Sequence, residues 1–163
     1  MFPSDLTAQA EALLDHLRKR GLKLAAAESC TGGLLTALLT EIAGSSDVVE
    51  RCFVTYSNAA KHEMLGVPEA MLAKHGAVSE PVARAMADGA LANSAADVAV
   101  AVTGIAGPGG GTAAKPVGLV HFAAARRGGG VLHRECRFGD IGRSEVRIAS
   151  VREALQLFSR AAG

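Results

Sequence analysis

The sequence predicts an α/β fold, a three-layer α/β/α sandwich built around a mixed, mostly parallel five-stranded sheet. Apolar strands alternate with amphipathic helices along most of the chain, a pattern typical of parallel β-α-β connections. The run 98–102 is apolar at every position, as expected for a strand buried on both faces. Near the C-terminus, the glycine-rich residues 126–130 separate two further apolar runs and predict a hairpin, so at least one strand is antiparallel.

Helices are expected where apolar residues recur on one face or where a start signal precedes them. The N-terminal helix carries Leu6, Leu13, Leu14 and Leu17 on such a face, and the C-terminal helix carries Ile148, Val151, Leu155 and Phe158. Proline in the first turn, as in Ser79-Glu80-Pro81, favours a helix start. The expected helices are 4–20, 31–42, 59–66, 68–74, 79–94 and 143–161, and the expected strands are 22–27, 51–56, 98–102, 117–125 and 131–138.

Length and composition favour one compact domain over residues 1–163, with 49% hydrophobic residues and no tryptophan. The net charge of +1 gives no reason to expect a nucleic-acid or acidic-membrane partner. No apolar run is long enough for a transmembrane helix, and the N-terminus lacks the pattern of a signal peptide. The three cysteines are widely spaced and odd in number, which indicates a reducing compartment and hence a cytoplasmic protein. No spacing typical of a metal site occurs, so no metal is expected.

The heptapeptide 27–33 (Ala-Glu-Ser-Cys-Thr-Gly-Gly) lies where the first strand turns into a helix. A hydroxyl residue at such a corner meets the free N–H groups of the first helical turn, which can stabilise an oxyanion. Thr31 or Ser29 is expected to cap the helix, and Gly32 and Gly33 allow close approach to a ligand. The alternative is an ordinary capped helix start without chemistry.

A serine nucleophile needs a base, and none of the five histidines lies in a triad motif. Lys61 is the candidate base, as in Ser–Lys enzymes, because it follows the start of the third helix at Ser57-Asn58. The helix dipole there opposes a cation weakly, by about 0.3–1 kcal/mol, so burial must supply most of any pKa decrease. The alternative is a solvated surface lysine.

Tyr56 is the one tyrosine and lies at the end of the second expected strand. In a parallel sheet this strand end shares a rim with Ser29, at the crevice where open α/β sheets bind ligands. Its hydroxyl is expected to relay a proton between Ser29 and Lys61 or to orient the amine. The alternative is a tyrosine at the edge of the core.

Two further features border the same rim. The glycine-rich stretch 103–111 follows the third strand but matches neither a Walker A loop nor GxGxxG, and it is either an amide cradle for a ligand or a flexible surface loop. Arg143 and Arg147 lie one turn apart at the start of the last helix and either clamp a phosphate or form a solvated basic face. A cysteine-based hydrolase using Cys30 is a separate alternative, for which no histidine partner is evident.

Several ordered segments resemble the CinA C-terminal domain family, whose stand-alone members are nicotinamide-nucleotide amidases. The resemblance covers about residues 5–160. It rests on 27–33 (AESCTGG), 56–58 (YSN) with Lys61, 66–67, 76–80 (GAVSE), 103–110 (TGIAGPGG), and 138–140 (FGD) with Arg143 and Arg147. The stretch 139–143 departs from the commoner Gly-Asp-Arg pattern, which leaves open which arginine meets the phosphate.

The resemblance implies an α/β/α fold and hydrolysis of nicotinamide mononucleotide to nicotinic acid mononucleotide and ammonia, without a cofactor. Members also occur fused to another domain in competence- or damage-inducible proteins, and a length of 163 residues favours a stand-alone enzyme. The resemblance also implies a homo-oligomer. A nucleotide-binding or regulatory module without turnover is the alternative function.

Carried over residue by residue, the resemblance implies that Ser29 is the nucleophile, Lys61 the general base and Tyr56 its aide. The backbone amides of Cys30, Thr31, Gly32 and Gly33 would form the oxyanion hole. The substrate would be bound by Thr103, Gly104, Gly107, Gly109, Arg143 and Arg147.

Overall fold

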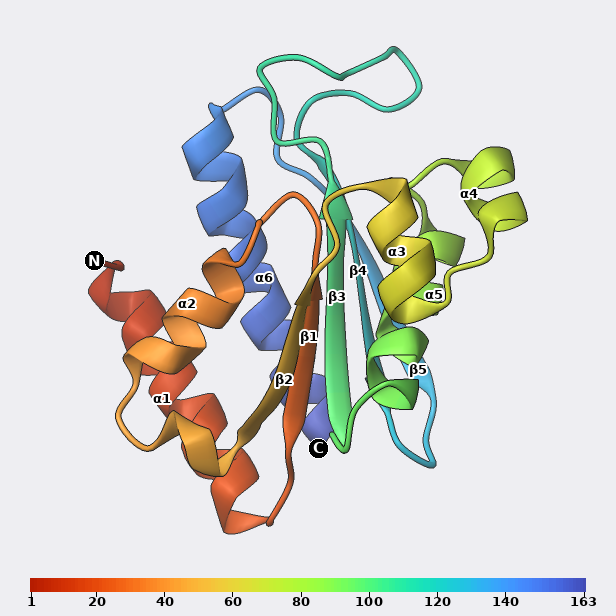
Figure 1. Ribbon diagram of the computed structural model, residues 1–163. Helices are drawn as coiled ribbons and strands as arrows, with labels where there is room; N and C mark the ends of the chain where they lie inside the picture. Colours follow the sequence, from red (N-terminus) through yellow and green to blue (C-terminus); the bar gives the residue numbers. More distant parts are fainter.

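A five-stranded sheet forms the centre of the molecule in the computed structural model, which describes residues 1–163 (Figure 1). Its strands are β1 (Leu24–Glu28), β2 (Val49–Val54), β3 (Val98–Gly104), β4 (Leu119–Arg126) and β5 (Val131–Arg137), in the order β2-β1-β3-β4-β5. β1 pairs in parallel with both β2 and β3, whereas β4 pairs antiparallel with β3 and β5. Only β4 runs against the other four strands, which confirms the predicted mixed sheet.

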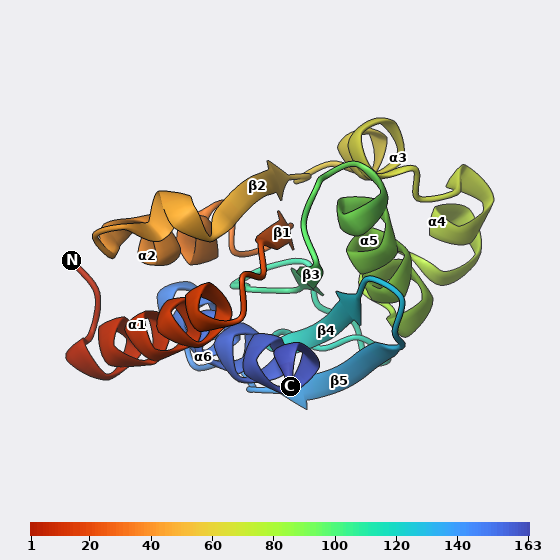
Figure 2. The ribbon, with the colours of Figure 1, turned by 90° about the horizontal axis from the view of Figure 1, so that it is seen from below.

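Helices cover both faces of the sheet, which confirms the predicted sandwich (Figure 2). One face carries α1 (Ser4–Lys19), α2 (Leu34–Glu41) and α6 (Arg143–Ala162), and the other carries α3 (Asn58–Leu65), α4 (Glu69–His75) and α5 (Glu80–Ala92). No helix is both long and apolar enough to cross a membrane.

The two faces of β3 bury different kinds of side chain. Val98, Val100 and Val102 pack into the larger core with α1, α2 and α6, whereas Ala99 and Ala101 pack into the smaller core with α5. Alternation of this kind follows from the period of two in a strand. The small alanine side chains allow α5 to lie close to the sheet on that face.

The first strand and the second helix begin later than the sequence predicts. β1 covers Leu24–Glu28 and α2 starts at Leu34, because Gly32 and Gly33 both have positive φ and turn the chain before the helix. No cap by Thr31 or Ser29 forms, so that prediction is wrong. Instead, the carboxylate of Glu28 accepts hydrogen bonds from the N–H groups of Gly33, Leu35 and Thr36.

The other boundaries shift by a few residues. β2 ends at Val54, so Tyr56 lies beyond the strand, while β3 extends to Gly104 and includes Thr103. A short 3-10 helix, η1 (Ser45–Asp47), lies within the expected loop after α2. The glycine-rich connection therefore spans residues 105–118, and it projects at the top of Figure 1 beside the N-terminus of α6. The carboxyl ends of β1, β2 and β3 meet at this rim, where ligands bind in open α/β sheets.

Candidate active site

A pocket of about 290 Å³ lies at the carboxyl rim of the sheet. Its walls come from the corner after β1, the start of α3, the connection between α4 and α5, the loop after β3 and the first residue of α6. The lining residues are Ser29, Cys30, Tyr56, Asn58, Lys61, Ala77, Val78, Thr103, Gly104, Ile105, Ala106, Gly107, Gly109, Gly110 and Arg143.

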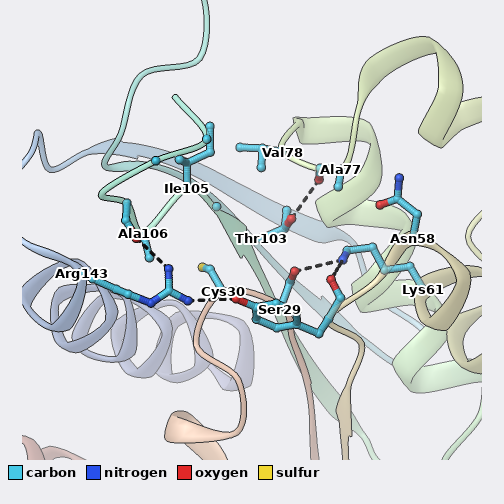
Figure 3. A pocket seen from close by; sticks show the side chains of 15 residues that line it. Ser29, Cys30, Asn58, Lys61, Ala77, Val78, Thr103, Ile105, Ala106 and Arg143 are labelled. Carbon is cyan, nitrogen blue, oxygen red and sulfur yellow. Dashed lines mark hydrogen bonds between the residues drawn. The ribbon is translucent and has the colours of Figure 1, made fainter. Parts of the chain in front are cut away.

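Ser29 and Lys61 are in direct contact at the base of this pocket (Figure 3). Lys61 Nζ lies 2.9 Å from Ser29 Oγ, although the two residues are 32 positions apart in the sequence. Ser29 is held because its N–H donates to Val102 O on β3 at 2.9 Å. Ser57 Oγ accepts the N–H of Ala60 at 3.0 Å, which fixes the start of α3 and thereby the position of Lys61.

Lys61 is buried, with only 1% of its surface exposed. Its amine also donates to Thr55 O at 2.8 Å and Tyr56 O at 3.3 Å, so all three of its partners are uncharged oxygen atoms. Burial without a carboxylate partner lowers the pKa of Lys61 below its ordinary value of 10.5. A lysine in this setting is suited to accept the hydroxyl proton of Ser29.

Tyr56 does not occupy the predicted position between the serine and the lysine. Its side chain is 60% exposed, and its hydroxyl accepts a hydrogen bond from Arg143 Nη2 at 2.9 Å. The predicted proton relay through this hydroxyl is therefore not formed. The backbone carbonyl of Tyr56, rather than its side chain, contacts the amine of Lys61.

The two arginines of α6 differ in their relation to the pocket, because Arg147 lies one helical turn further along α6 than Arg143. Arg143 lines the pocket, and its Nη1 donates to Gly107 O at 2.7 Å. Arg147 lies outside the lining and donates from Nη2 to Thr31 O at 2.9 Å. The structure thus brings only Arg143 to the place where a substrate would bind.

Fewer backbone N–H groups are available for an oxyanion hole than the sequence predicts. The N–H of Gly32 donates to Ser29 O at 3.0 Å, and the N–H of Gly33 donates to the Glu28 carboxylate. Thr31 is fully buried and lies outside the pocket lining. Cys30 lines the pocket, and its N–H has no acceptor within the protein. The N–H of Thr31 has none either, but Thr31 does not line the pocket, so Cys30 offers the free N–H that borders the site.

The loop after β3 forms the opposite wall of the pocket, at the rim where the sequence analysis placed the glycine-rich stretch. Gly104, Gly107 and Gly109 all line the pocket. Thr103 is fully buried, and its hydroxyl donates to Ala77 O at 2.9 Å, which ties the wall at β3 to the segment before α5.

Sequence reasoning assigned no role to several lining residues, among them Asn58, Ala77 and Val78. These residues do fall within the segments that carry the family resemblance. Ile105, Ala106 and Gly110 were seen only as members of the glycine-rich stretch. Contacts made by the backbone or by small side chains do not require a particular residue type, so the sequence gives no signal for these positions.

The cysteine alternative finds no support in the geometry. Burial raises the pKa of the Cys30 thiol to about 12, with a smaller contribution from the nearby Glu28 carboxylate. No histidine lines the pocket. His121 and His133 contact each other on β4 and β5 instead, with Nδ1 and Nε2 3.0 Å apart. No group of three or more His, Cys, Asp or Glu side chains is arranged to hold a metal ion.

Comparison with known proteins agrees with these features. The family profile described as the CinA C-terminal domain matches residues 6–162. The chain is 52% identical over 157 residues to the nicotinamide-nucleotide amidohydrolase PncC of Escherichia coli K12, covering 96% of this chain and 94% of that protein. It is also 59% identical over 142 residues to a CinA-like protein of a Mycobacterium species, but covers only 33% of that protein. The chain thus spans about a third of such longer relatives.

Solved structures show the same fold. The competence/damage inducible protein CihA of Agrobacterium tumefaciens superposes with a TM-score of 0.99 at 55% identity, over 100% of this chain and 99% of that one. A CinA superfamily protein of Klebsiella pneumoniae gives a TM-score of 0.91 at 35% identity, over 96% and 97% of the two chains. The chain therefore belongs to the CinA C-terminal domain family.

Proposed function

We propose that this protein is a nicotinamide-nucleotide amidase, which hydrolyses nicotinamide mononucleotide to nicotinic acid mononucleotide and ammonia. The contact of 2.9 Å between Lys61 Nζ and Ser29 Oγ, inside a pocket, carries the proposal. The identity of 52% to the Escherichia coli amidohydrolase, over nearly the full length of both chains, supports the choice of substrate.

In the first half-reaction, Ser29 Oγ attacks the carboxamide carbon and Lys61 takes the hydroxyl proton. When Lys61 is neutral, its two N–H bonds are directed to Thr55 O and Tyr56 O, which leaves the lone pair for Ser29. The Cys30 N–H donates a hydrogen bond to the negatively charged carbonyl oxygen, since the residue after the nucleophile is the usual donor in serine hydrolases. Lys61 then passes its proton to the amide nitrogen, which leaves as ammonia.

In the second half-reaction, Lys61 removes a proton from water, and the resulting hydroxide attacks the acyl group on Ser29. Collapse of the tetrahedral intermediate breaks the bond to Ser29 Oγ, which recovers its proton from Lys61. The product carboxylic acid gives its proton to water, and nicotinic acid mononucleotide is released as a carboxylate. Every proton transfer during bond making and breaking is assigned to Lys61, so the proposed mechanism requires no cofactor.

The substrate phosphate is assigned to the side of the pocket formed by Arg143 and the loop after β3. The backbone N–H groups of Ala106, Gly107, Gly109 and Gly110 have no acceptor within the protein. Free N–H groups beside a guanidinium are typical of phosphate binding. Arg147 is not included in this site, because it lies outside the pocket lining.

Further parts of the proposal concern the protein as a whole. The domain is assigned to residues 1–163, acting as a homo-oligomer in the cytoplasm on pyridine nucleotide recycling. Three free thiols, at Cys30, Cys52 and Cys136, are in keeping with a reducing compartment. Sedimentation of the purified protein measures the oligomeric state.

The decisive experiment measures ammonia release from nicotinamide mononucleotide by the wild type, Ser29→Ala and Cys30→Ala. We expect turnover by the wild type and by Cys30→Ala, and none above background by Ser29→Ala. Equal rates for wild type and Ser29→Ala would remove Ser29 from the mechanism. Tight nucleotide binding by calorimetry without ammonia release would indicate a nucleotide-binding module instead.

A further inference from the structure

Two peptide groups that are hydrogen-bonded to each other, Thr31–Gly32 and Ser29–Cys30, connect Arg147 to the Cys30 N–H. Arg147 Nη2 donates to Thr31 O at 2.9 Å, and the N–H of that same peptide group, on Gly32, donates to Ser29 O at 3.0 Å. The N–H of the Ser29–Cys30 peptide group is the free one beside the pocket. A cation thus stands at one end of a hydrogen-bonded series, and the donor proposed for the oxyanion stands at the other.

Such a series does two things to its last donor. Each hydrogen bond fixes the orientation of the next peptide plane, so the direction of the Cys30 N–H depends on where Thr31 O is held. Hydrogen bonds in series also polarise one another, which makes the terminal N–H a better donor. Charge-assisted bonds such as that from the Arg147 guanidinium are the stronger kind.

Glu28 anchors the same corner from the helix side. It is fully buried, and its Oε2 accepts the N–H groups of Gly33 and Leu35 at 3.0 and 3.1 Å. Its Oε1 accepts the N–H and hydroxyl of Thr36 at 2.9 and 2.6 Å. Four donors face two oxygens, an arrangement that only a carboxylate satisfies in full. The N-terminus of α2 is thereby filled from within and is not open to a substrate anion.

We propose that Arg147 and Glu28 are positioning residues that hold the Cys30 N–H and Ser29 in the geometry required for stabilising the oxyanion. Neither side chain touches the pocket. The inference rests on the proposed Ser29 mechanism, but not on the identity of the amide substrate. It assigns the two arginines of α6 to different tasks, since Arg143 faces the ligand and Arg147 faces the corner.

The test compares Arg147→Met, Arg147→Lys and Glu28→Gln with the wild type in two assays. The first measures kcat and KM for nicotinamide mononucleotide. The second measures the rate at which a small alkyl fluorophosphonate labels Ser29. In that reaction the Oγ–P bond forms, the P–F bond breaks, fluoride leaves and Lys61 takes the hydroxyl proton, while a phosphoryl oxygen occupies the oxyanion position.

We expect Arg147→Met to lower kcat by about 10–100-fold, because small displacements of oxyanion donors have effects of this size. KM should stay within about threefold, since the variant leaves the ligand contacts in place. Labelling should slow in proportion to kcat. Arg147→Lys keeps a charged donor for Thr31 O and should recover part of both losses. Glu28→Gln replaces two acceptor contacts by an NH2 group facing N–H donors and should behave like Arg147→Met.

Matched controls separate positioning from general loss of stability. Arg127→Met removes an arginine that donates to Ala96 O and Leu91 O, at 2.9 and 2.7 Å, away from the pocket. Asp97→Asn weakens a carboxylate contact to the Lys23 N–H at the opposite end of the sheet. Both controls should keep wild-type kcat and labelling rates after their folding is checked by circular dichroism.

Wild-type kcat and labelling in folded Arg147→Met would overturn the inference, as would an increase in KM alone. Equal losses in Arg127→Met would do the same. If Glu28→Gln does not fold, the two Arg147 variants decide the matter. A wild type that is labelled by the fluorophosphonate but releases no ammonia would overturn the proposed substrate, and the labelling rates would still test the positioning role.

Discussion

The corner after β1 and the loop after β3 face each other across the pocket, and the N–H groups of their glycines differ in whether they have partners. In the corner, the N–H groups of Gly32, Gly33 and Leu35 have acceptors within the protein, and that of Cys30 stays free beside the nucleophile. In the loop, Ala106, Gly107, Gly109 and Gly110 have none. Both segments are rich in glycine, and from sequence alone both suggest an anion cradle.

The difference indicates that the two segments have different roles, one in catalysis and the other in binding. In the corner, the paired N–H groups of Gly32 and Gly33 fix the geometry around the free Cys30 N–H, which a nucleophile and its oxyanion donor require. A loop with free donors gains its partners from the ligand. Gly32 and Gly33 turn the chain in the first segment, with φ of +56° and +94°. Gly107 and Gly110 turn the chain in the second segment as well, with φ of +81° and +85°, and their N–H groups remain free for a ligand.

Removal of the proposed base, Lys61, tests the catalytic role of the corner and should have the largest effect. Lys61→Met should lower kcat for nicotinamide mononucleotide by about 10³-fold or more, since Ser29 loses its proton acceptor. The measurement is steady-state ammonia release. Lys115→Met is the matched control, because Lys115 Nζ donates to His75 O at 2.6 Å outside the pocket lining, and its activity should be retained.

The pH dependence follows from the lowered pKa of the same lysine. Because the neutral amine is the active form, kcat/KM should rise with pH to a midpoint below the ordinary value of 10.5. Stability should change in the same direction. The unfolded chain takes up the proton first as pH falls below 10.5, so the wild type loses stability there, and Lys61→Met should remove that slope in urea unfolding. A midpoint at or above 10.5 would contradict a buried base.

Removal of Arg143 tests the binding role assigned to the loop after β3 and its neighbour Arg143. Arg143→Ala should raise KM for nicotinamide mononucleotide by about 10–100-fold, as expected for a hydrogen bond to a charged group, with a small change in kcat. Nicotinamide riboside, which lacks the phosphate, should show no such change. Tyr56→Phe removes the hydroxyl that accepts from Arg143 and should raise KM only a few-fold, about 2–5-fold. A fall in kcat for Tyr56→Phe as large as that for Lys61→Met would restore the proton-relay role.

Single alanine substitutions should give the smallest effects and sharpen the contrast between the glycines. Gly32→Ala forces a side chain into the left-handed region and should cost about 1–2 kcal/mol of unfolding free energy. Gly109 has no positive φ and nothing within 4 Å of an added Cβ, so Gly109→Ala should stay within about 0.5 kcal/mol. Urea unfolding measures both. Equal losses would show that the backbone at Gly109 is as constrained as the backbone at Gly32.

Most of the fold and the core of the candidate site were predicted from the sequence. The alternation of apolar strands and helices is a local signal, so the order of elements and the mixed sheet were found. Ser29, Lys61 and the glycine loop could be placed at one rim, because parallel strands bring their carboxyl ends together. The predicted helix start at 31 was wrong, since Gly32 and Gly33 turn the chain before the helix. The predicted cap was also wrong, since a strand residue, Glu28, takes the role that Thr31 or Ser29 was expected to fill.

The sequence by itself determined which elements form and which strand ends and loops meet at the pocket rim, because periodicity and turn chemistry act between near neighbours in the chain. Only the tertiary structure decided which side chains and backbone groups are hydrogen-bonded to each other at the site. Arg143 meets Tyr56 across 87 residues and Arg147 meets Thr31 across 116, and no local pattern distinguishes the two arginines. Burial of Lys61 without a carboxylate is likewise a property of the packed molecule, since desolvation depends on every element that closes around the amine.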